Sequence, residues 1–146
     1  MHMSLIRLIW TRLIKREEVN MFAINEDNSI YITRGDVAVI EVSAVDSSGE
    51  QHTFQPGDVV RLQVFEKKNV ERIKLSKSVL VEEATTVVEI LLETEDTRYD
   101  GLVHKPTDYW YEITLNPVTA PQTIVGYDED GPKVFRLFPE GRNEHE

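Results

Sequence analysis

The tripeptide Arg34-Gly35-Asp36 is the best-known recognition motif in the chain, because integrins bind this sequence. It lies between two candidate strands, where a tight turn or a bulge needs a glycine and where charged neighbours are readily solvated. A match of three residues is weak evidence for binding. We therefore predict a turn at Gly35 and no adhesive role for the tripeptide.

Two acidic clusters contain residue types that can bind calcium or catalyse acid–base reactions. Residues 128–131 (Asp-Glu-Asp-Gly) begin like a calcium loop but lack the later ligands and the bidentate glutamate that such a loop requires. Glu93, Glu95 and Asp96 are paired carboxylates, which perform acid–base catalysis only in an enclosing pocket that shifts their pKa values. We predict a solvated turn at 128–131 and an exposed acidic loop that begins a short helical turn at Asp96-Thr97.

No other catalytic pattern is present. The four histidines have no metal-ligand spacing, and the chain has no nucleophile elbow, phosphate-binding loop or dinucleotide fingerprint. The absence of cysteine excludes disulfides, thiolate zinc sites and cysteine nucleophiles. The sequence therefore predicts a protein that is not an enzyme, with no catalytic, metal-binding or cofactor-binding residues and no cofactor.

One apolar residue is out of pattern. In the stretch 109–115, alternation puts Tyr109, Tyr111, Ile113 and Leu115 on the core face, so that Trp110 shares the other face with Glu112 and Thr114. Either Trp110 is an exposed interface anchor, or another segment covers it. Trp110 is thus the leading candidate interface residue.

Length, composition and charge narrow the class of protein. A chain of 146 residues with 40% hydrophobic residues is sufficient for one domain with an ordinary core. The formal net charge of −10 repels phosphate backbones, so we expect no nucleic-acid partner. No apolar run approaches the roughly 20 residues of a membrane helix, so we expect no membrane partner.

Residues 1–20 differ from the rest because they are basic and have a helical apolar pattern. Leu5, Ile9 and Leu13, together with Ile6 and less centrally Trp10, fall on one helical face. A signal peptide is disfavoured, since arginines interrupt the apolar run and no small-residue cleavage site follows. Two interpretations remain: an amphipathic helix that docks through Leu5, Ile9 and Leu13, with Trp110 as one docking place, or a segment upstream of a natural start at Met21.

From Met21 onward the apolar period is two. About eight short strands are expected, at 30–33, 38–44, 60–64, 75–82, 86–93, 108–115, 122–127 and 133–138, separated by turn-rich segments, the last two of them joined by a hairpin link. Short strands without long helices between them favour an antiparallel sandwich or small barrel. We divide the chain into an extension (1–20), a β domain (21–139) and a polar tail (140–146).

The order of features from Asn28 to Phe138 resembles small structural proteins of tailed bacteriophages, typified by the N-terminal domain of baseplate upper proteins. The matching segments are 29–36 (SIYITRGD), 53–60 (TFQPGDVV), 95–97 (EDT), 109–115 (YWYEITL), 123–124 (TI) and 134–138 (VFRLF). The sequence departs from this family at one point. The family commonly has a glycine directly before the aromatic strand, whereas here Gly101 stands well before Tyr109.

This resemblance implies an all-β, antiparallel immunoglobulin-like β-sandwich that assembles into a virion and carries no catalytic residues. On this basis we predict a tail or baseplate component that binds other phage tail or baseplate proteins, forms homo-oligomers or rings, and is assembled in the bacterial cytoplasm. The alternatives are a carbohydrate-binding sandwich that recognises host glycans through Trp110 and neighbouring tyrosines, and a hydrolase with an unrecognised site.

Overall fold

The computed structural model describes residues 3–12, 23–25, 27–46, 48–66, 72–101, 104–129 and 131–141. Over these residues the protein is all-β. The strands are β1 (Met3–Arg12), β2 (Ala23–Ile24), β3 (Ile30–Thr33), β4 (Ala38–Asp46), β5 (Val59–Phe65), β6 (Ile73–Leu80), β7 (Val88–Leu92), β8 (Thr107–Leu115), β9 (Gln122–Val125) and β10 (Lys133–Phe138), with one 3₁₀ turn, η1 (Thr94–Thr97).

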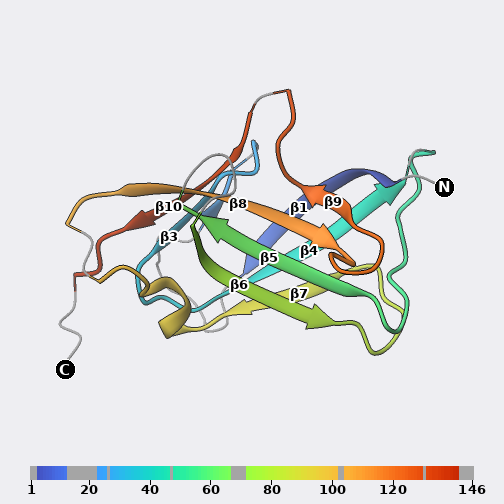
Figure 1. Cartoon of the computed structure of the whole chain (residues 1–146), viewed down its shortest axis with the longest axis horizontal. Coiled ribbons are helices and arrows are strands. Elements are labelled where there is room, and N and C mark those ends of the chain that lie inside the picture. Colours follow the sequence, from blue (N-terminus) through green and yellow to red (C-terminus); the bar gives the residue numbers. More distant parts are fainter. Residues whose placement is uncertain are drawn as a thin grey trace.

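The strands form two sheets (Figure 1). The small sheet has the order β1-β4-β7, and the large sheet has the order β2-β3-β10-β8-β5-β6, with β9 pairing to β8 beside β10. The chain crosses between the sheets after β1, β3, β4, β6 and β7, so each sheet is built from segments that are distant in sequence. β6 and β7 lie side by side at one lateral edge of the molecule.

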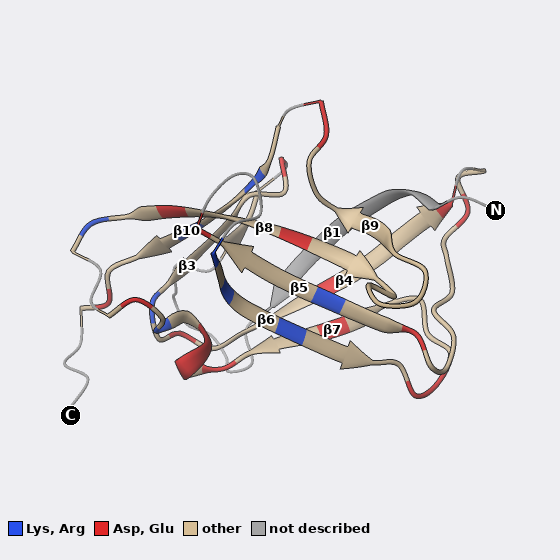
Figure 2. Cartoon of the chain, viewed as in Figure 1, with Lys and Arg blue, Asp and Glu red and all other residues tan. Residues whose placement is uncertain are grey.

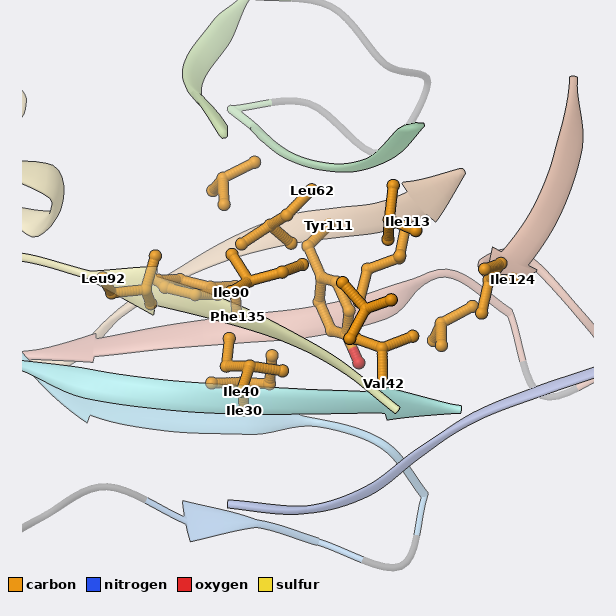
Figure 3. Close-up of a cluster of buried hydrophobic side chains, with 14 of the residues drawn as sticks. Ile30, Ile40, Val42, Leu62, Ile90, Leu92, Tyr111, Ile113, Ile124 and Phe135 are labelled. Atoms are coloured by element: carbon orange, nitrogen blue, oxygen red, sulfur yellow. The ribbon is translucent and has the colours of Figure 1, made fainter. Parts of the chain in front are cut away.

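Buried side chains from both sheets form a single core (Figure 3). Ile40, Val42 and Ile90 come from the small sheet and pack with residues such as Leu62 and Phe135 of the large sheet. All five are completely buried. The alternation that was visible in the sequence arises because each strand turns one face to this shared core and the other face outward.

The predicted strands at 30–33 and 133–138 are confirmed at both ends, and six others are confirmed with shifted ends. Between β4 and β5, Phe54 makes an isolated bridge to Thr85. The predicted hairpin link is wrong: β9 and β10 both pair with β8, and Asp128 and Gly131 close a tight turn between them. The sheets are not purely antiparallel, because β3 and β10 run parallel.

The predicted N-terminal helix is wrong over the described residues, since Met3–Arg12 is strand β1 and pairs antiparallel with β4. The register of this pair shifts between Met3 and Leu5 and again between Leu8 and Trp10. Such irregularities break strict alternation, so the period of two was hidden in the sequence. The physical reason for a strand is tertiary: β1 covers the hydrogen-bonding edge of β4, which would otherwise be exposed.

Removing residues 1–20 should therefore destabilise the fold without abolishing it. A chain that begins at Met21 loses β1 and leaves the small sheet with β4 and β7 only, its edge on β4 open to other chains. We expect a β-type circular dichroism spectrum, a melting temperature lower by several degrees, and greater self-association in light scattering. An unchanged melting temperature would show that the pairing of β1 with β4 adds nothing to stability.

Candidate functional site

Trp110 lies on the outer face of the large sheet, as the sequence predicted. Its neighbours in β8, Tyr109 and Tyr111, are buried in the core, so Trp110 points away from the small sheet. Its side chain is half-buried.

An apolar row crosses four strands at Trp110. Val134 of β10 and Phe65 of β5 are its direct cross-strand partners. Phe65 in turn pairs with Ile73 of β6, at a shift in the β5–β6 register between Val64 and Phe65. Partners in register share a face of the sheet, which places Val134 and Phe65 beside Trp110. Phe65 is 4% exposed yet lies outside the core cluster. We call Val134, Trp110, Phe65 and Ile73 the Trp110 strip. Ile73, at its end, is 54% exposed.

A polar row flanks the strip on one side. Arg136 of β10 makes a two-pronged ion pair with Asp108 of β8, with N···O distances of 2.6 and 3.1 Å. The guanidinium also lies 4.9 Å from the ring centre of Tyr31 in β3. Both carboxylate and guanidinium are about one-third exposed, so this row forms a polar border of the strip and contributes little to stability.

A second polar row flanks the strip on the other side. Glu112 of β8 is paired with Gln63 of β5, which donates a hydrogen bond of 3.4 Å to Ser76 of β6. Glu112 is half-buried, and burial raises the pKa of its carboxyl group, opposed by attraction to Arg61. The strip is thus an apolar band between two polar rows, and Figure 2 shows charged segments on β8, β5 and β6.

The buried position of Glu112 gives a testable pH dependence. Because the pKa of Glu112 is raised in the folded protein, the folded protein holds the carboxyl proton more strongly than the unfolded chain does. The stability of the fold therefore falls as pH rises from the unfolded pKa of this group through its folded pKa. Glu112→Gln should therefore raise the melting temperature at pH 7 and give no gain below about pH 4. A lower melting temperature of the variant at pH 7 would show that attraction to Arg61 outweighs burial.

The turn predicted at Arg34-Gly35-Asp36 is confirmed. Gly35 has a φ of +87°, which favours glycine, and the amide of Asp36 donates a hydrogen bond of 3.0 Å to the carbonyl of Thr33. Arg34 is 3% exposed. An adhesive tripeptide must present its guanidinium to a receptor, and here that group is inside the protein, which agrees with the predicted absence of an adhesive role.

Arg34 belongs to a buried ionic cluster at one end of the two sheets. Its Nη1 lies 2.7 Å from Oε2 of Glu140, and Nη2 of Arg98 lies 2.8 Å from Oε1 of the same carboxylate. The amide of Gly35 donates a hydrogen bond of 2.6 Å to the hydroxyl of Thr97 in η1. The cluster joins the end of β3, the end of η1 and the segment after β10. Its role is therefore structural.

We expect Glu140→Gln to be strongly destabilising. Glu140 is 2% exposed and faces two guanidinium groups, so the variant removes the negative charge that both ion pairs share, at a cost on the order of 3 kcal/mol in the free energy of unfolding. Asp108→Asn is the matched control, because its ion pair with Arg136 is partly exposed and should cost less than about 1 kcal/mol. Urea unfolding measures both, and equal costs would contradict the structural role of the cluster.

The other candidates for chemistry do not form a site. Glu93 and Glu95 are exposed, and Asp96 caps η1 through the amide of Glu93 and pairs with Lys77 at 2.9 Å. In the described ranges, no three His, Cys, Asp or Glu side chains are grouped so that they could hold a metal ion. The described part of the chain likewise has no helix that is long and apolar enough to cross a membrane.

The structure separates the candidate interface residues. Trp110 is on the large sheet, Leu5 and Ile9 are in β1 of the small sheet, and Leu13 lies outside the described residues. Sequence reasoning missed Phe65, Ile73 and Val134, whose proximity to Trp110 depends on strand register. Only the alignment of four strands brings them together.

Comparison with known proteins adds no family. The sequence matches no protein-family model and no curated protein.

Proposed function

We propose that this protein is a non-enzymatic structural component of a phage or prophage tail or baseplate, and that it acts through protein–protein contacts in the virion. The observation that carries the proposal is the Trp110 strip. An apolar row that runs across the outer surface of a sheet, bordered by polar rows, has the composition of a small interface: apolar centre, polar rim. Tryptophan is also among the commonest energetic anchors of such contacts.

The fold supports the same proposal at a coarser level. Two sheets around one core, with the chain crossing repeatedly between them, are compatible with the immunoglobulin-like sandwich that the sequence resemblance implies. The parallel pair β3–β10 departs from a purely antiparallel arrangement. We retain the immunoglobulin-like assignment as part of the proposal.

The positions of the aromatic residues favour protein contacts over glycan recognition. A carbohydrate platform in β8 would need Tyr109 and Tyr111 beside Trp110 on one accessible surface. Both tyrosines are buried instead, at 5% and 3% exposure, and belong to the core. Trp110 is therefore the only member of this aromatic triplet on the outer face.

Oligomer formation through the strip is testable with one pair of surface variants. Ile73→Lys places a charge at the exposed end of the strip, whereas Val118→Lys places the same charge at an exposed apolar residue in the turn after β8. We expect Ile73→Lys to weaken association at least about tenfold, either with itself or with the tail proteins encoded beside it, and Val118→Lys to leave it unchanged. Analytical ultracentrifugation measures association, and melting temperatures confirm folding.

Trp110→Ala extends the test to the centre of the strip and should weaken association at least as much as Ile73→Lys. If both strip variants associate like the unaltered protein, the strip is not an interface and the proposed function loses its support. If Val118→Lys weakens association equally, the added surface charge, and not its position in the strip, causes the loss.

A further inference from the structure

A groove lies beside the paired lateral edges of the two sheets, away from the Trp110 strip. Its volume is 560 Å³ and it is open to solvent. The lining combines aliphatic side chains and carboxylates from both sheets and from the turn between β6 and β7: Val79, Val81, Val87 and Val88, with Glu41, Glu82, Glu83, Glu89 and Thr85. Figure 2 shows acidic segments on β4, on β7 and in the turn that follows β6.

The strands beside the groove are both edges. β6 is the last strand of the large sheet and β7 the last of the small sheet, and in the described part of the chain each pairs with one neighbour only. The outer edge of a strand presents backbone N–H and C=O groups that accept an additional strand. An extended segment lying here therefore has backbone partners as well as side-chain partners.

The negative charge of the lining indicates which kind of segment binds in the groove. Four glutamates contribute to it, of which Glu41 is buried, and no lysine or arginine is among the lining residues that the structure describes. Glu82 and Glu83 are exposed at the turn, whereas Glu89 on β7 and the facing Glu41 on β4 already have interactions within the chain. A segment with basic side chains is attracted by this field, and aliphatic side chains on its other face match the four valines. In an extended segment successive side chains point to opposite sides, so alternating basic and aliphatic residues face two different surfaces.

We propose that this groove binds an extended segment of a partner protein in which lysine or arginine alternates with aliphatic residues. The inference rests on the proposed function, because it assigns a second contact surface to the same assembly protein. The basic side chains lie against Glu82 and Glu83, and the aliphatic side chains lie on Val79 and Val87, the two half-buried valines of the lining. The backbone of the segment adds a strand to the edge of β6 or β7.

The probe is a fluorescent eight-residue peptide of alternating valine and lysine, with valine–glutamate and serine–lysine peptides as comparisons. We expect only the valine–lysine peptide to bind the full chain measurably in fluorescence anisotropy. Amide resonances of Val79, Val81, Val87 and Val88 should shift on binding. If the serine–lysine peptide binds equally well, the interaction is non-specific charge attraction and the proposal is overturned. The proposal is also overturned if the valine–lysine peptide does not bind.

Charge-matched variants locate the site. Glu82→Gln with Glu83→Gln removes two lining carboxylates, and we expect roughly tenfold weaker peptide binding. Glu50→Gln with Glu129→Gln removes two exposed carboxylates outside the lining and should leave binding unchanged. Equal weakening by both pairs would overturn the groove as the site.

The same measurements separate this inference from the proposed function. Ile73→Lys should leave peptide binding intact, since Ile73 is not part of the lining. If the peptide fails to bind while Ile73→Lys still disrupts association, the groove is wrong and the proposed function stands. If the peptide binds and neither strip variant affects association, the groove stands as a peptide site and the proposed assembly role loses its support.

Discussion

The alternation of strand β8 is the constraint on which most of the structure depends. β8 pairs with β5 along one side and with β10 and β9 along the other, so its residues fix the register of three neighbours. Its inward tyrosines make edge-to-face contacts, Tyr111 with Phe135 at 6.5 Å and Tyr109 with Tyr99 at 5.0 Å between ring centres. Such contacts stabilise aromatic pairs beyond simple burial of area.

The hydroxyl groups of these tyrosines are satisfied at the border of the core. Tyr111 donates a hydrogen bond to the carbonyl of Asn28, which ties β8 to the turn before β3, and Tyr109 donates one of 3.2 Å to Asp100. Burial raises the pKa of Tyr109 to about 12 and raises the pKa of Tyr111 further. Both phenols therefore stay neutral in the physiological range, and a slip of one residue in β8 would leave them without these partners.

The sequence was informative where structure follows from local pattern and uninformative where it depends on pairing between distant segments. Alternation alone placed Trp110 outside and Tyr111 inside, because a strand has two faces. It could not reveal that Ile73 lies in line with Trp110, since that needs the register of three strands, nor that Glu140 meets Arg34, since those residues are separated by most of the chain. Segment 5–12 was misread because short apolar runs fit both periods and the partner strand decides between them.

The two proposed surfaces are physically complementary because they respond in opposite ways to salt. A chain of net charge −10 repels its own copies at long range, so self-association through an apolar strip works against electrostatics. Added salt shortens the range of that repulsion, to about 8 Å at physiological ionic strength, and leaves apolar burial intact. Contact at the Trp110 strip should therefore strengthen as salt increases. Attraction between the glutamate-lined groove and a basic segment is screened by the same ions and should weaken. A single acidic chain can thus hold like copies through one surface and a basic partner through the other, with ionic strength shifting the balance between them.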